Sequence, residues 1–141
     1  MPEPPHNSSP SSLRLRLRPE LLAVYRWART PSFPALPEAV WGAPFWAAVG
    51  TETEWSLVLP ETVPVDAPHR EPGWRALGVE GPLDFSLVGI LAGLAGVLAR
   101  EGIALFAVST FDTDYLLVKA DSLDRAVAAL RRAGHEVATP A

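Results

Sequence analysis

The sequence predicts an α+β protein, and three observations support this fold class. The second half of the chain contains the patterns of a strand, a helix, two strands, a helix and a strand, in the order βαββαβ. A strand–turn–strand pattern occurs twice, because "FWAAVGTETEWSLV" (45–58) aligns with "LFAVSTFDTDYLLV" (105–118) at an offset of sixty residues. Apolar residues make up 48% of the 141 residues, which is enough to bury a core. We therefore expect antiparallel sheets backed on one face by helices.

The repeat predicts two related units. We expect a flexible tail at 1–12, which is rich in Pro and Ser, a first unit at 13–65, a linker at 66–71 and a second, complete unit at 72–141. The first unit is expected to be truncated. Its segment "PSFPALPEAVWGAP" contains four prolines and leaves room only for a short helix near 38–41, and "PETVPVDAPHREPGW" shows no second helix.

The first unit begins with "LRLRLRP", whose three leucines and three arginines alternate strictly. Alternation with period two is typical of a half-buried strand, with the leucines on the core face. We interpret the arginines as a solvated sheet face or a charged edge, in preference to a phosphate-binding stripe. "ELLAVYRW" is expected to form the second strand.

The second unit opens with "GWRALGVEG", a strand bounded by glycines. "DFSLVGILAGLAGVLAREG" predicts a helix with Asp84 or Ser86 as its N-cap and Gly102 just beyond its C-terminal end. Three interior glycines each cost a helix about 1 kcal/mol relative to alanine. Such a small-residue stripe indicates a close approach, either of the sheet beneath the helix or of a partner chain or ligand.

The remaining elements complete the βαββαβ order. "IALFAV" is apolar on both faces, as expected of a central strand, and "DYLLVKA" pairs back on it. "DSLDRAVAALRRAG" predicts a second helix with Ser122 as N-cap and Gly134 at its end. "HEVA" is expected to form a short last strand.

Composition excludes several classes of function. Twelve basic and sixteen acidic residues give a net charge of −4, which argues against nucleic acid or an anionic membrane as a partner. No cysteine is present, and the N-terminal sequence does not resemble a signal peptide, so we expect a soluble, cytoplasmic protein. The three histidines are isolated from one another and from any nucleophile. We therefore expect no enzyme activity, no catalytic residue, no metal site and no cofactor.

The second unit resembles a known family. Its most specific stretches, "GWRALGVEGPLDFS" and "STFDTDYLLV", resemble the ACT domain, and "TETEWSLV" is similar to the corresponding stretch of the first unit. The chain is most similar to small two-unit ACT proteins related to CASTOR-type arginine sensors and to the regulatory regions of aspartokinases. The resemblance implies tandem ferredoxin-like βαββαβ units, the first of them truncated.

The resemblance also implies a function. Regulatory ACT proteins bind amino acids where two units meet, so we expect an amino-acid sensor that forms a homo-oligomer, a dimer in the simplest case, and signals to an unidentified protein target. A zwitterion needs donors for its carboxylate and an acid for its ammonium group. Helix-opening N–H groups are expected to supply the donors, Asp84 the acid, and the hairpin of a neighbouring unit the facing wall. The expected ligand-binding residues are Asp84, Phe85, Ser86, Leu87, Val88, Gly89, Ser109, Thr110, Asp112, Thr113 and Asp114, with Thr51 to Glu54 as the corresponding turn of the first unit.

Simpler interpretations stay open for these residues. Asp84 and Ser86 are explained equally well as helix caps, and Asp112 and Asp114 as ordinary turn residues. The alternative function is therefore a ligand-free, ACT-like oligomerisation or interaction module.

Overall fold

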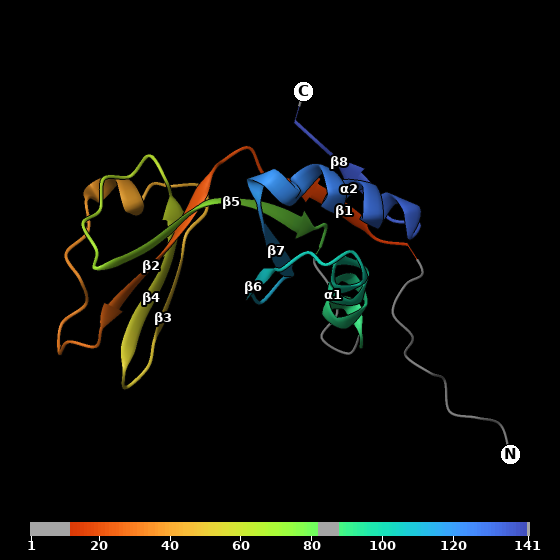
Figure 1. Ribbon diagram of the computed structural model, residues 1–141. Coiled ribbons are helices and arrows are strands. Elements are labelled where there is room, and N and C mark those ends of the chain that lie inside the picture. The colour runs from red at the N-terminus through yellow and green to blue at the C-terminus, as the bar shows by residue number, and fades with distance from the viewer. Residues whose placement is uncertain (1–11, 82–87, 141) are drawn as a thin grey trace, which may run out of the picture. The chain divides into compact units, whose positions relative to one another are not determined.

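The computed structural model describes residues 12–81 and 88–140, and it divides the chain into two compact units (Figure 1). One unit, which we call the helical unit, comprises Met1–Pro19 and Ala76–Ala141. The other, the central unit, comprises Glu20–Arg75. Both contain a mixed arrangement of strands and short helices, so the predicted α+β class is confirmed.

The helical unit contains the complete βαββαβ order that the sequence predicts. Its strands follow one another in the sheet as β6–β7–β5–β1–β8. Its elements are β1 (Arg14–Leu17), the end of β5 (His69–Val79), α1 (Ile90–Arg100), β6 (Phe106–Ser109), β7 (Asp114–Lys119), the 3₁₀ turn η2 (Ala120–Ser122), α2 (Leu123–Arg132) and β8 (Glu136–Ala138).

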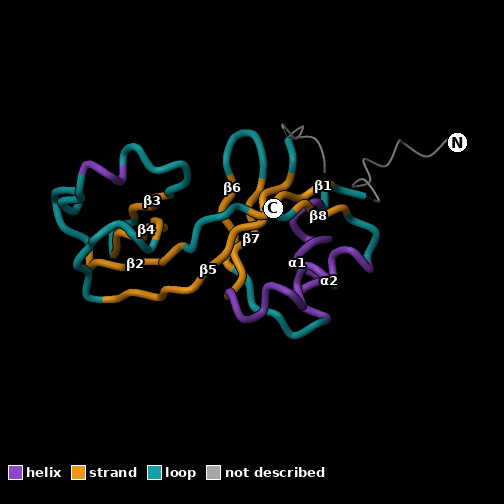
Figure 2. The backbone as a smooth tube through the Cα atoms, turned by 90° about the horizontal axis from the view of Figure 1, so that it is seen from above, coloured by secondary structure: helices purple, strands orange, loops and turns teal. Residues whose placement is uncertain are grey.

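Both helices lie on one side of this sheet (Figure 2). The buried face of α1, formed by Ile90, Leu94, Val97 and Leu98, packs in the same core as leucines of β1 and β7. Alternation explains the sheet's contribution, because residues two apart on a strand point to one face. The leucines of "LRLRLR" are buried in this core, as the sequence predicts.

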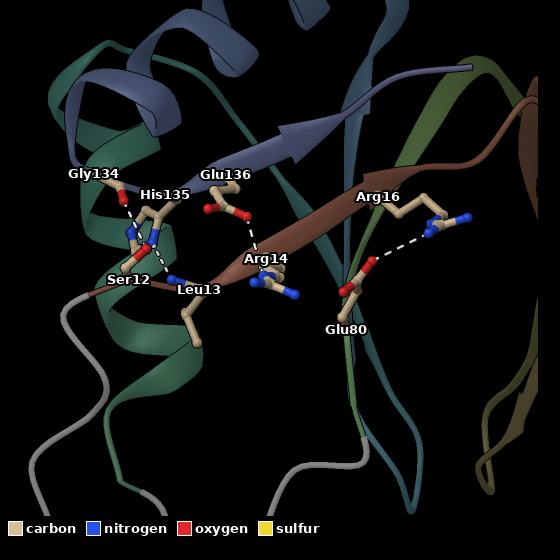
Figure 3. A network of polar contacts seen from close by, with 8 residues as sticks. All are labelled: Ser12, Leu13, Arg14, Arg16, Glu80, Gly134, His135 and Glu136. Atoms are coloured by element: carbon tan, nitrogen blue, oxygen red, sulfur yellow. Dashed lines mark hydrogen bonds and ion pairs between the residues drawn. The ribbon is translucent and has the colours of Figure 1, made fainter. Parts of the chain in front are cut away.

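Strand β1 is an addition to the βαββαβ order, because it lies between the first strand, β5, and the last, β8. It pairs antiparallel with β5 and parallel with β8, so this sheet is not purely antiparallel. Its beginning is also held by side chains (Figure 3). The N–H of Leu13 donates to Nδ1 of His135 over 3.1 Å, and Oγ of Ser12 donates to the carbonyl of Gly134 over 2.9 Å.

The central unit contains four strands in the order β3–β4–β2–β5, and neighbouring strands are antiparallel. One face is covered by loops and a 3₁₀ turn, which bury Tyr25, Leu57 and Leu59. The short helix expected near 38–41 is this 3₁₀ turn. The elements of the central unit are β2 (Leu22–Ala28), η1 (Glu38–Val40), β3 (Ala47–Gly50), β4 (Glu54–Pro60) and the beginning of β5.

The units have other bounds than the sequence analysis expects. The segment 13–19 lies with the helical unit, because β1 pairs with the end of β5 and its leucines enter that unit's core. Residues 69–71, expected in a linker, belong to β5 and pair with β2. The pairing partners of both segments are distant in sequence, so local patterns do not reveal them.

The two hairpins correspond at an offset of 59 residues, and the offset of sixty is wrong by one. Gly50 pairs with Trp55 in one hairpin and Ser109 with Asp114 in the other. Leu57 and Leu116 then both face their unit's core. A shift of one residue moves every side chain to the opposite face of a strand.

The pattern of "IALFAV" predicts a central strand, and this prediction is wrong. Among the described residues, β6 pairs only with β7. Its residues are half-buried or exposed. The strand is thus an apolar edge of the helical unit's sheet.

Candidate functional site

A cavity of about 330 Å³ lies on the face of the helical unit's sheet that points away from the core. Arg16 pairs directly with Gly78 across β1 and β5, so both lie on this face. Tyr115 covers Gly78 closely, since a Cβ atom built on Gly78 would be 2.8 Å from the ring. The cavity is lined by Arg16, Arg18, Gly78, Val79, Glu80, Gly81, Asp112, Thr113 and Tyr115.

The lining of the cavity includes two arginines and two acidic residues, and one arginine and one acid form an ion pair. Nη2 of Arg16 lies 3.3 Å from Oε1 of Glu80 (Figure 3), and these side chains are 72% and 41% exposed. Exposed pairs of this kind contribute little to stability, about 0 to 1 kcal/mol. Both groups are therefore available for exchange with a charged ligand at little cost to the fold.

The tip of the β6–β7 hairpin forms a second wall of the cavity. Oγ1 of Thr113 donates to the carbonyl of Val79 over 2.6 Å, which fastens the tip to β5. Oγ1 of Thr110 accepts from the N–H groups of Asp112 and Thr113 over 3.3 and 3.2 Å. These bonds fix the backbone of Asp112 at the cavity.

The central unit uses the same turn chemistry. Oγ1 of Thr51 accepts from the N–H groups of Thr53 and Glu54 over 3.2 and 3.1 Å. Glu54 forms an ion pair with Arg26, with Nε and Oε2 separated by 3.0 Å. The repeated hydroxyls thus stabilise turns, as Thr commonly does.

A groove of about 620 Å³ beside this turn is a poorer candidate. Its arginine, Arg29, already donates to the carbonyls of Thr51 over 2.6 Å and Thr30 over 3.1 Å. The same guanidinium lies 4.1 Å from the centre of the Trp55 ring. Its charge and its donors are thus engaged within the unit.

The structure brings two of the predicted site residues, Asp112 and Thr113, into the cavity. Oγ of Ser109 instead donates to Oδ1 of Asp114 over 2.6 Å within the hairpin. Thr110 stabilises the turn. Asp84, Phe85, Ser86 and Leu87 lie outside the described residues.

The first helix of the helical unit begins later than the sequence predicts. Its N-cap is Gly89 in the left-handed conformation with φ of 78°, and its first residue is Ile90. Val88 is exposed and precedes the helix. The first N–H groups of α1 are therefore those of Ile90 to Ala92, and Val88 and Gly89 precede the helix.

Sequence reasoning missed four charged or aromatic residues of the cavity, Arg16, Arg18, Glu80 and Tyr115. The alternation of "LRLRLR" correctly placed the arginines on the exposed face, but only the pairing of β1 with β5 brings them beside Glu80. No local signal in the sequence indicates that pairing.

Two features are absent from the residues that the structure describes. Within residues 12–81 and 88–140, no three His, Cys, Asp or Glu side chains are grouped so as to hold a metal ion. Within the same part of the chain, no helix has the length and hydropathy required to cross a membrane.

The helical unit thus combines a βαββαβ order with a cavity that holds a guanidinium and a carboxylate on one face of its sheet. Comparison with protein families shows that residues 69–132 match the model of the ACT domain. The recognition made from "GWRALGVEGPLDFS" and "STFDTDYLLV" is thereby confirmed.

Similar curated proteins are the cytosolic arginine sensors for mTORC1, subunit 1, of Homo sapiens and Bos taurus. Each is 38% identical to this chain over 60 residues, which is 42% of this chain and 18% of the relative. The match therefore spans less than a fifth of these relatives' length.

Solved structures extend the similarity beyond the ACT match. A protein of Agrobacterium tumefaciens has a TM-score of 0.81 at 29% identity and covers 92% of this chain and 95% of its own. The ligand-free regulatory subunit of aspartate kinase from Thermus thermophilus has a TM-score of 0.56 at 12% identity, covering 85% of this chain and 96% of its own. The latter supports the fold alone.

Proposed function

We propose that this protein is an amino-acid-binding regulatory protein without catalytic activity of its own. The observation that carries the proposal is the cavity of the helical unit, where Arg16 and Glu80 lie side by side. An α-amino acid is a zwitterion, and its two charges require an arginine and a carboxylate within a few ångströms. A cavity of about 330 Å³ suits a ligand of that size, because it lies at the lower end of the range typical of small-molecule sites.

The relatives support this proposal. ACT domains are regulatory, and a sensor of arginine shares 38% identity with this chain over 60 residues. The sequence analysis expects the ligand between two ACT units. We propose that a second copy of the chain closes the open side of the cavity and that the dimer, bound to its amino acid, signals to a protein target.

Thermal denaturation in the presence of each of the twenty amino acids tests the function. An amino acid at about 100 times its Kd stabilises the fold by roughly 2.7 kcal/mol, which raises the Tm by roughly 5 to 10 °C. Arg16→Gln should remove the shift, whereas Arg14→Gln, on the same strand but outside the cavity, should retain it. If no amino acid at millimolar concentration raises the Tm, the proposal is wrong.

The second candidate function is a ligand-free oligomerisation module. It is favoured by the apolar edge strand β6 and by the turn bonds of Thr51 and Thr110, which explain these hydroxyls without a ligand. This function predicts a dimer in light scattering and no thermal shift with any amino acid.

A further inference from the structure

We propose that the Arg16–Glu80 ion pair is itself the recognition element for the amino-acid backbone, and that the ligand inserts into it. In the bound state, the guanidinium of Arg16 holds the ligand's α-carboxylate and the carboxylate of Glu80 holds its α-ammonium group. This inference rests on the proposed function. It specifies which residues of the cavity bind the two charged groups of the amino acid, and it states that these groups replace the contact between Arg16 and Glu80.

The first support is the geometry of the pair. Arg16 lies on β1 and Glu80 directly follows the neighbouring strand β5, and their side chains point toward one another (Figure 3). Both residues line the cavity. Their contact is a single one at 3.3 Å, which is longer than usual for a charge-assisted hydrogen bond. A guanidinium prefers to bind a carboxylate through two parallel hydrogen bonds, so a ligand carboxylate that binds in this way is a better partner than Glu80.

The second support is the rigid backbone beneath both side chains. The N–H of Glu80 donates to the carbonyl of Arg14 over 2.8 Å, and Arg16 pairs in register with Gly78. Thr113 also fastens the hairpin to the carbonyl of Val79. Only side-chain rotations are then needed to separate the two charges.

Insertion explains selectivity for a zwitterion. A ligand with a carboxylate alone binds Arg16 and leaves Glu80 without its partner, and an amine alone does the reverse. An α-amino acid supplies both charges, so each member of the opened pair gains a new partner and the loss of their mutual contact is offset. The cavity therefore recognises what all amino acids share, and its remaining walls are left to distinguish side chains.

The structure provides a matched control on the same strand. Nε of Arg14 lies 3.1 Å from Oε2 of Glu136, and both side chains are about 70% exposed (72% and 69%). Neither residue lines the cavity. Glu136→Gln removes the same charge as Glu80→Gln from the same unit, so the long-range electrostatic change is similar in both variants.

The experiment is an NMR titration of the full-length protein with L-alanine, propionate and ethylamine, which carry both charges, the carboxylate alone and the amine alone. Glu80→Gln should weaken L-alanine binding about three- to tenfold, since it removes the partner of the ammonium group. The same variant should strengthen propionate binding about two- to sixfold, since it removes a competing carboxylate from Arg16. Glu136→Gln should change both affinities less than twofold, and Arg16→Gln should weaken both.

Opposite changes for L-alanine and propionate are the signature of insertion, which a structural role of Glu80 would not produce. The inference is overturned if Glu80→Gln changes both in the same direction, or if it equals Glu136→Gln. Its failure is distinguishable from failure of the proposed function: wild-type protein would then still bind an amino acid from the set of twenty. Thermal denaturation of each variant establishes that it is folded.

Discussion

Gly93→Ala should stabilise this protein, and the reason lies in the exposed face of α1. Gly93 is exposed in the fourth position of the helix, and a Cβ atom built on it meets no other atom within 4 Å. The sequence analysis interprets the glycine stripe as the mark of a close approach, but the described residues make none at Gly93. An exposed glycine inside a helix costs about 1 kcal/mol relative to alanine.

The expected gain of about 1 kcal/mol corresponds to a rise in Tm of about 3 to 4 °C for a chain of this size. Differential scanning calorimetry measures it, and urea denaturation should show a higher midpoint with an unchanged slope. Ala92→Gly, at the preceding exposed position, is the matched control and should lower the Tm by a similar amount.

An unchanged or lower Tm for Gly93→Ala would refute this reasoning. It would mean that another chain approaches the helix at Gly93, because the free helical unit leaves the position open. The Tm deficit should then grow with protein concentration, since a partner copy is bound more fully at higher concentration.

Three further predictions follow from single contacts. Ala107→Lys, which places a charge on edge strand β6, should lower the dimeric fraction in light scattering, whereas Ala138→Lys on the opposite edge strand, β8, should not; equal effects would contradict β6 as the interface. His135→Ala should lower the free energy of unfolding by about 1 kcal/mol in urea denaturation, because the N–H of Leu13 loses its acceptor. A change below about 0.3 kcal/mol, roughly the error of such a comparison, would show that water replaces the ring as acceptor. Gly78→Ala should displace the Tyr115 ring and weaken amino-acid binding in calorimetric titration, with Gly42→Ala, which meets no atom within 4 Å, as the control that leaves binding unchanged.

The sequence predicted the elements of the helical unit well, because their signals are local. Helix α2 occupies its expected place between Ser122 and Gly134, and both glycines that follow the helices, Gly102 and Gly134, have positive φ. Alternation in "LRLRLR" placed the leucines in the core. Such patterns depend only on neighbouring residues, so they survive without knowledge of the fold.

The sequence failed where a local glycine or a distant strand decides the structure. In the sequence, the apolar spacing of α1 extends back to Leu87. Gly89 adopts a left-handed conformation, however, and α1 begins only after it, at Ile90. Similarly, the acids of the two hairpins align by chemistry at sixty residues, whereas backbone pairing sets the offset at 59. Residue similarity in a short turn does not fix strand register, because Asp, Glu and Thr are interchangeable in turns.

In each unit an aromatic side chain covers a glycine, but the surroundings of the two rings differ. Trp55 covers Gly50 in the central unit, as Tyr115 covers Gly78 in the helical unit. Trp55 packs half-buried against its unit's core, and two exposed residues contact its ring: Phe33 edge-on at 5.1 Å and Arg29 at 4.1 Å.

Tyr115 instead follows the opposite strand parity. Leu116 and Val118 face the core. Side chains alternate along a strand, so Tyr115 and Leu117 point to the opposite face. The ring consequently lies on the face that carries Arg16, opposite the face on which α1 and α2 pack. The Tyr115 ring thus belongs to a cavity that also holds a paired guanidinium and carboxylate, whereas the groove that Gly50 lines contains an arginine that is already engaged within the unit. This is why we assign amino-acid binding to the helical unit and not to the turn of the central unit.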